Sequence, residues 1–110
     1  MTVKQLAEKC SFKVLSMPDG DREIDGCYMG DLLSWVMGRA NADNVWITIM
    51  TNSNITAVAS LADMSCILLA EDALPDKDVI NIGMEKNINI ISSPLPQYET
   101  AISVYTALQE

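Results

Sequence analysis

The chain has 110 residues, and its seven lysines and arginines stand against fifteen aspartates and glutamates, which gives a net charge of −8. This length suits one domain with a single core, and a hydrophobic fraction of 49% is ordinary for a globular protein. The acidic balance argues against nucleic acid and against an anionic membrane as partners, because phosphate binding needs clustered basic side chains.

The chain also lacks the apolar segments that direct a protein into or across a membrane. No stretch is apolar over the ~20 residues that a membrane helix requires, and the first ten residues, MTVKQLAEKC, lack a signal-peptide core. Cys10, Cys27 and Cys66 are odd in number and far apart, which indicates thiols rather than a disulfide framework. We therefore expect a cytoplasmic, reduced protein.

The first part of the chain alternates between helical and strand-like patterns. The patterns predict a helix over residues 2–9, a strand over 11–17 and a turn over 18–21. A second strand over 22–30 and a second helix over 31–40 follow. In the first strand we expect Phe12 and Val14 to point inward, with Leu15 as a further candidate. In the second helix we expect Asp31 to cap the start and Gly38 to lie near the end.

From residue 44 onward, strand and helix alternate with short connections. The patterns predict strands over residues 44–51, 65–70 and 88–93. They predict helices over residues 54–64, 74–87 and 96–108. The apolar runs in these strands are typical of a parallel sheet buried on both faces. The predicted class is α/β, a single domain over residues 1–110 with a largely parallel sheet of about five strands and helices on both faces.

Three of the predicted helices carry wide or unusual apolar surfaces. The stripe of the last helix is formed by Tyr98, Ala101, Ile102, Tyr105 and Leu108. The helix after Asp31 is apolar on several sides, so that either it is buried or one side meets a second subunit. Small side chains in the helix after Asn54 allow another backbone to approach it closely, either within the domain or across a two-fold axis. The interface candidates are Leu32, Trp35, Val58 and Leu61.

The residue types exclude several kinds of catalytic and metal site. Without histidine there is no Ser-His-Asp triad, no Cys-His pair and no histidine-containing zinc site. The segment 21–26, DREIDG, begins like a calcium loop, but its twelfth position is Leu32 where a bidentate Glu is required. The segment GCYMGD lacks the glycine and lysine of the phosphate-binding motifs. We therefore expect no metal ion and no cofactor.

Two turns, MGD at 29–31 and TNSN at 51–54, precede predicted helices. One interpretation makes them helix starts, with Asp31 and either Ser53 or Asn54 as capping residues. The other makes them a ligand site, because parallel sheets bind ligands beyond the carboxyl ends of their strands. The candidate ligand-binding residues are Gly30, Asp31, Ser34, Thr51, Asn52 and Asn54.

Four runs in this order, GCYMGDLLSWVM, NVWITIMT, NITAVASLADMSCILLA and LPDKDVINIGMEKNINIISS, resemble the DRTGG domain family over about residues 23–108. The chain is most similar to the small stand-alone members. The resemblance implies an α/β domain similar to the N-terminal domain of HPr kinase/phosphorylase, without catalytic activity of its own. In regulated pyrophosphatases the module accompanies CBS domains and contributes to dimer contacts. Stand-alone members often occur beside iron-hydrogenase and anaerobic electron-transfer proteins.

The chain departs from the family pattern at two places. Asn52 stands where members often carry histidine, and the segment AEDALPD after the fourth strand lacks the usual glycine. The namesake motif is also not recognisable. If those residues serve a ligand in relatives, the ligand has been lost or changed in this chain.

Three functions follow from the residues and the resemblance together. The first is a non-catalytic regulatory or scaffolding domain that acts as a homodimer or with another protein, linked by the resemblance to anaerobic redox or hydrogenase systems. The alternative is a sensor that binds a nucleotide or another small anion at the two turns. The third, and the least favoured by the residues, is a small enzyme with paired carboxylates.

Overall fold

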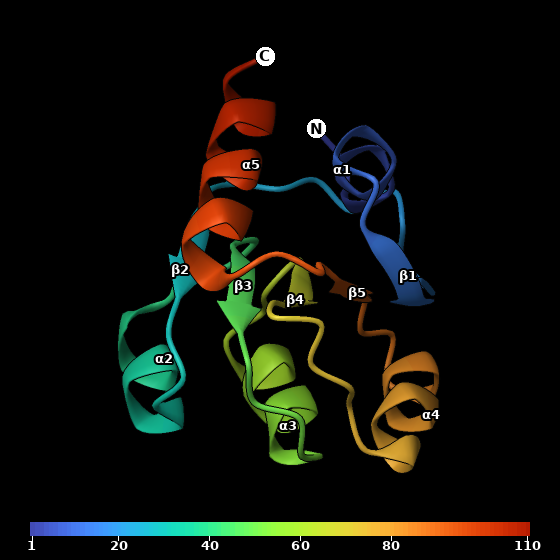
Figure 1. The fold of residues 1–110 in the computed structure, drawn as a ribbon. Coiled ribbons are helices and arrows are strands. Elements are labelled where there is room, and N and C mark those ends of the chain that lie inside the picture. The colour runs from blue at the N-terminus through green and yellow to red at the C-terminus, as the bar shows by residue number, and fades with distance from the viewer.

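The computed structural model describes residues 1–110 and contains five helices and five strands (Figure 1). The helices are α1 (Val3–Cys10), α2 (Leu33–Arg39), α3 (Asn54–Leu61), α4 (Lys77–Glu85) and α5 (Gln97–Gln109). The strands are β1 (Lys13–Ser16), β2 (Cys27–Met29), β3 (Val45–Thr48), β4 (Cys66–Leu69) and β5 (Ile90–Ser92). Every predicted helix and strand is therefore present, within a few residues of its expected bounds.

The five strands form one sheet in the order β1-β5-β4-β3-β2. The strands from β2 to β5 are parallel to their neighbours, and β1 pairs antiparallel with β5. The predicted α/β class with a largely parallel five-stranded sheet is confirmed. The sheet is mixed because its first strand enters antiparallel at one edge.

Helices cover both faces of the sheet. Since α2, α3 and α4 each connect a strand to its next parallel neighbour, right-handed crossovers place all three on one face. The opposite face is covered by α1 and α5 (Figure 1). The strand order runs in one direction from β2 to β5, so the parallel part has no point where the winding reverses. Such a reversal is where open α/β sheets form their ligand crevice.

The inner strands β3 and β4 are buried on both faces, as their apolar runs predict. Val45 and Ile47 of β3 join the core cluster under α1 and α5, and Trp46 joins the cluster under α2, α3 and α4. All residues of β3 and β4 are buried. The pleat of a strand sends alternate side chains to opposite faces, so a strand between two helix layers needs an unbroken apolar run.

The expectation for Val14 is wrong in part. Phe12 is buried as expected, but Val14 is 50% exposed. Both side chains line a groove beside α1. Val14 thus lies on the side of the sheet that α1 covers, but β1 is an edge strand and the helix leaves its outer part open.

The apolar stripe of α5 is divided: Ala101 and Leu108 are partly buried against the core cluster under α1 and α5, but its three large side chains face away from the core. The helix buries Thr100, Val104 and Ala107 instead. Tyr98, Ile102 and Tyr105 are 71%, 46% and 67% exposed. Large apolar side chains on the outer face of a helix are unusual, and they mark a surface that a partner can cover.

Candidate functional site

The two turns singled out from the sequence lie at the same edge of the sheet. Gly30 and Asp31 follow β2, the turn over residues 51–54 follows β3, and these strands are parallel neighbours. Gly30 continues their pairing, because its N–H donates to the carbonyl of Ile47 at 3.1 Å. Its own carbonyl accepts a bond from the side-chain Nε1 of Trp46 at 2.9 Å. The turns therefore share an edge of the sheet, but the bonds at this edge join Gly30 and Asp31 to Ile47–Ile49 and not to the turn over residues 51–54.

Asp31 is the centre of a hydrogen-bond cluster at this edge. Its Oδ1 accepts from Thr48 Oγ1 at 2.8 Å and from the backbone N–H of Ile49 at 2.9 Å. Nε2 of Gln97, at the start of α5, donates to Oδ1 and Oδ2 at 3.3 and 3.2 Å. The carboxylate thus joins the end of β2 to the end of β3 and to the first turn of α5.

The expectation that Asp31 caps α2 is wrong. Leu32 occupies the capping position, and no side chain bonds to the start of this helix. The carboxylate turns to β3 because two donors stand there within reach, and bonds to a charged acceptor are the stronger ones. The sequence singles out neither Thr48 nor Gln97, since nothing local marks a threonine or glutamine that bonds to a residue on another element.

The turn before α3 is closed by Asn52. Its Oδ1 accepts from the N–H of Asn54 at 2.9 Å, and its carbonyl accepts from the N–H of Ile55 at 3.3 Å. Ser53 makes no side-chain capping bond, and Asn54 is an exposed first residue of the helix. Ser53 therefore occupies the capping position, as one alternative expects, but the side-chain bond to the helix start comes from Asn52.

Replacing Asn52 by alanine is expected to lower the free energy of unfolding by about 1 kcal/mol, the usual loss for a helix-start bond. The matched change Asn54→Ala removes no side-chain bond and should stay within about 0.5 kcal/mol of the original chain. Urea unfolding followed by circular dichroism measures both. Equal losses for the two variants would contradict the assignment of Asn52.

The remaining candidate ligand residues have no cavity around them. Ser34 is exposed on α2, and the carbonyl of Thr51 accepts from the N–H of Asp76 at 3.0 Å. None of the four cavities in the structure is lined by any of the six candidates. Glu71 and Asp72 follow the next strand, β4. With Asp31 they make this edge acidic, which suits a phosphate poorly.

The interface candidates on α2 are at the surface. Only Val36 of this helix is buried, so the alternative that α2 is buried on all sides is wrong. Leu32 and Trp35 are 58% and 51% exposed. The guanidinium of Arg39 lies 3.7 Å from the centre of the Trp35 ring, a cation–π contact that covers part of it.

The two interface candidates on α3 have different surroundings. Leu61 is exposed and remains available to a partner. Val58 is buried in the core cluster under α2, α3 and α4. It stabilises the monomer and offers little surface to a second chain.

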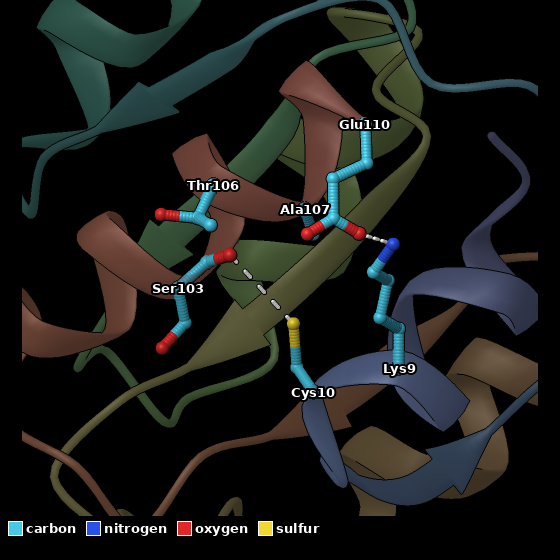
Figure 2. A pocket seen from close by; sticks show the side chains of 6 residues that line it. All are labelled: Lys9, Cys10, Ser103, Thr106, Ala107 and Glu110. Carbon is cyan, nitrogen blue, oxygen red and sulfur yellow. Dashed lines mark hydrogen bonds and ion pairs between the residues drawn. The ribbon is translucent and has the colours of Figure 1, made fainter.

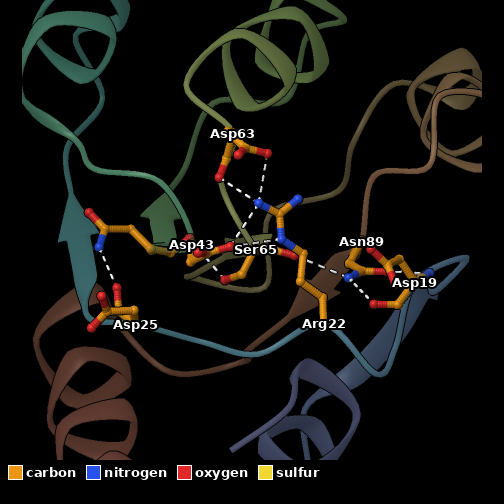
Figure 3. A network of polar contacts seen from close by, with 8 residues as sticks. Asp19, Arg22, Asp25, Asp43, Asp63, Ser65 and Asn89 are labelled. Atoms are coloured by element: carbon orange, nitrogen blue, oxygen red, sulfur yellow. Dashed lines mark hydrogen bonds and ion pairs between the residues drawn. The ribbon is translucent and has the colours of Figure 1, made fainter.

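The opposite, amino-terminal edge of the sheet carries a polar network around Arg22 (Figure 3). Arg22 Nη2 donates to Asp43 Oδ1 at 2.9 Å and to both the carbonyl and Oδ1 of Asp63 at 2.7 Å. Burial would lower the pKa of Arg22, but the bonds to Asp63 and Asp43 raise it. Nearby, Nδ2 of Asn89 donates to the carbonyls of Asp19 and Ser65 at 2.8 and 3.0 Å.

This network ties the segment before β2 to the loops that precede β3, β4 and β5. It contains the 21–26 segment that begins like a calcium loop, but no three acidic or cysteine side chains gather there or elsewhere as metal ligands. Every buried side-chain nitrogen and oxygen atom has a hydrogen-bond partner. The network is therefore complete without a bound ion, and its role is structural.

Replacing Arg22 by glutamine is expected to lower the free energy of unfolding by about 1–2 kcal/mol, because bonds from a charged donor are lost and two carboxylates keep no cation. Lys77→Gln is the matched control, since it removes the same charge at an exposed position without an ion pair. Thermal melts of the two variants measure the difference. A loss no greater than that of the control would contradict a structural role.

The largest cavity is an open groove of about 490 Å³ between β2 and α5. Its lining is mostly apolar and consists of Gly26, Cys27, Met29, Ala101, Tyr105, Leu108 and Gln109. The volume is in the range of small-molecule sites, but the groove opens along the free edge of the sheet.

A second cavity, of about 320 Å³, lies between α1 and α5 (Figure 2). The Cys10 thiol donates to the carbonyl of Ser103 at 3.7 Å, and Lys9 pairs with Glu110. Burial raises the pKa of Cys10, although Lys9 lowers it, and burial raises the pKa of Cys66 to about 12. Neither cysteine is a thiolate at neutral pH, so neither suits nucleophilic catalysis.

None of the five helices has the length and apolar character that crossing a bilayer requires.

No protein-family model and no curated protein matches the sequence. Among solved structures, the chain is similar to the CBS and DRTGG domains of the regulatory region of Clostridium perfringens pyrophosphatase, complexed with its activator diadenosine tetraphosphate. The TM-score is 0.70, and the match covers 94% of this chain and 45% of that chain. At 13% identity, this likeness shows the fold. The chain spans less than half the length of the regulatory region.

Proposed function

We propose that the chain is a non-catalytic regulatory or scaffolding domain of the DRTGG family that acts as a homodimer. The observation that carries the proposal is the likeness in fold, over nearly the whole chain, to part of a regulatory region. The runs that resemble DRTGG domains lie on β2, α2, β3, α3 and β4 to β5, which is the parallel part of the sheet. The cytoplasm, beside anaerobic redox or hydrogenase proteins, is the proposed setting.

The chemistry of the site supports a role without catalysis. The chain has no histidine. The carboxylate of Asp31, the acid at the centre of the candidate site, accepts structural bonds on both oxygens. A general base needs an accessible lone pair directed at a substrate, whereas this carboxylate accepts bonds from Thr48, Ile49 and Gln97 of the protein itself.

The homodimer is tested by light scattering after size exclusion at tens of micromolar. We expect a mass twice the 12.0 kDa of the chain. A monomer at that concentration would count against the proposal.

A second candidate function is a ligand sensor, since the similar regulatory region is complexed with diadenosine tetraphosphate. A thermal-shift panel of nucleotides, diadenosine polyphosphates and phosphometabolites tests it. A ligand present at about 100 times its Kd stabilises a protein by ~2.7 kcal/mol. The response should disappear in a Ser34→Ala, Asn54→Ala double variant if the ligand binds at the two turns. A panel without any shift, or a shift that survives both changes, would remove the turns as its site.

A further inference from the structure

We infer that a second copy of this chain pairs with the open edge of β2 and covers the apolar stripe of α5, so that two five-stranded sheets join across a two-fold axis. The inference rests on the proposed homodimer and names the surface through which the two copies meet. It differs from the helix faces that the sequence indicates, because it is carried by the placement of β2 and α5.

The first observation is the outward stripe of α5. Tyr98, Ile102 and Tyr105 recur at helical spacing on one face of this helix, and each is about half exposed or more. The helix covers the sheet with other residues, so the monomer does not use these three. An apolar stripe that a helix keeps but the monomer leaves in water indicates a partner.

The second observation is the free edge of the sheet beside that stripe. The N–H of Val45 donates to the carbonyl of Gly26 at 3.0 Å, and the N–H of Gly30 donates to Ile47. Alternate residues of a strand direct their backbone groups to opposite sides. The N–H and carbonyl groups of Cys27 and Met29 therefore point away from β3, toward the open edge.

The geometry of this edge suits a second copy of the same strand. A strand that pairs with its own copy about a two-fold axis runs antiparallel to it. With the axis at Tyr28, Cys27 of each copy lies opposite Met29 of the other. Each such pair exchanges both of its backbone hydrogen bonds. The 490 Å³ groove between β2 and α5 adjoins this edge and receives apolar side chains of the second copy.

The charge distribution favours a second copy over a basic partner. The chain has a net charge of −8, yet β2 has no charged residue and Glu99 is the only one within α5. Two acidic copies repel each other least across an uncharged face. A basic protein would instead be attracted to the acidic surface elsewhere on the chain.

The exposed area is close to what a stable dimer needs. A fully exposed aromatic side chain presents about 150–250 Å², so Tyr98, Tyr105, Ile102 and Met29 together offer on the order of 400 Å². The start of α2 follows β2 directly on the other face of the sheet, where Leu32 and Trp35 flank the same open edge and add on the order of 200 Å². A dimer of standard size buries about 800 Å² per copy, and backbone pairing along β2 supplies part of the rest.

The test compares four variants by light scattering and sedimentation, with circular dichroism and thermal melts to establish that each is folded. Tyr105→Glu puts a charge on the stripe and is expected to weaken the dimer about 100-fold, because the symmetric interface receives it twice. Met29→Pro removes an N–H that faces the open edge and leaves the pairing of β2 with β3 intact. It too should give a folded monomer.

Two controls introduce a glutamate at an exposed leucine on other surfaces of the chain. Leu74→Glu lies in the loop before α4, at a residue that is 78% exposed, and Leu61→Glu lies on α3. Both should remain dimers. If Leu61→Glu is monomeric while Tyr105→Glu and Met29→Pro are dimers, the inference is wrong and the proposed homodimer stands. If the unmodified chain is a monomer at tens of micromolar, both fail.

Discussion

Replacing Asp31 by alanine is expected to lower the free energy of unfolding by about 2–3 kcal/mol. The change removes the acceptor of the Thr48 hydroxyl, which belongs to a fully buried residue, and of the Ile49 N–H. It also removes both bonds from Gln97 at the start of α5. For a domain of this size the loss corresponds to a fall in Tm of about 10 °C or more. Differential scanning calorimetry measures both quantities.

Two matched variants separate the hydrogen bonds of Asp31 from its charge. Asp21→Ala removes a carboxylate that is exposed and makes no side-chain hydrogen bond, and it should leave Tm nearly unchanged. Asp31→Asn keeps an oxygen for Thr48 and Ile49, so we expect it to recover about half of the loss. If the Tm of Asp31→Ala equals that of the original chain, the cluster does not hold β2, β3 and α5 together.

Replacing Gly83 by alanine is expected to destabilise the protein by about 1–3 kcal/mol, although alanine is the better helix former. A Cβ at this position of α4 would lie 2.9 Å from Ile90 Cδ1, 3.1 Å from Ser16 Oγ and 3.2 Å from the carbonyl oxygen of Ile88. Ser16 Oγ donates to that same carbonyl at 2.9 Å, so it has little freedom to move. Helix and sheet would have to separate by a few tenths of an ångström.

Gly38→Ala on α2 is the matched control for the change at Gly83. A Cβ at Gly38 meets no atom within 4 Å, so the helix propensity acts alone. We expect this variant to be more stable than the original chain by about 0.5–1 kcal/mol. Urea unfolding of the two variants should therefore give changes of opposite sign. Changes of the same sign would mean that close packing of α4 is not the reason for glycine at position 83.

The order and type of the elements follow from local sequence patterns. The runs in β3 and β4 predict buried parallel strands because a strand between two helix layers has no polar face. Local patterns do not predict that β1 is antiparallel, because an edge strand has the same alternation of apolar and polar residues in either direction. The bounds of α3 and α4 are shorter than their patterns, because helix ends depend on what the flanking residues bond to.

The candidate site stays a prediction, and the hydrogen bonds of its residues differ from those that the sequence indicates. That the turns after β2 and β3 lie at the same edge of the sheet follows from parallel pairing of neighbouring strands. That Asp31 bonds to Thr48 and Gln97 does not follow, because Gln97 is 66 residues away and only the packing of α5 brings it near. At the start of α3 the sequence leaves Ser53 and Asn54 as alternative capping residues, whereas the side-chain bond comes from Asn52.

The sequence by itself determined the α/β class, the parallel strands and the absence of histidine chemistry, because these depend on residue types and on spacing within one element. Only the tertiary structure decided which faces remain open. The apolar stripe of α5 has the spacing of a core face, but Thr100, Val104 and Ala107 are the residues that face the sheet. A helix can bury either of two adjacent faces, and the packing of the other elements selects one. Here that selection leaves the stripe beside the free edge of β2.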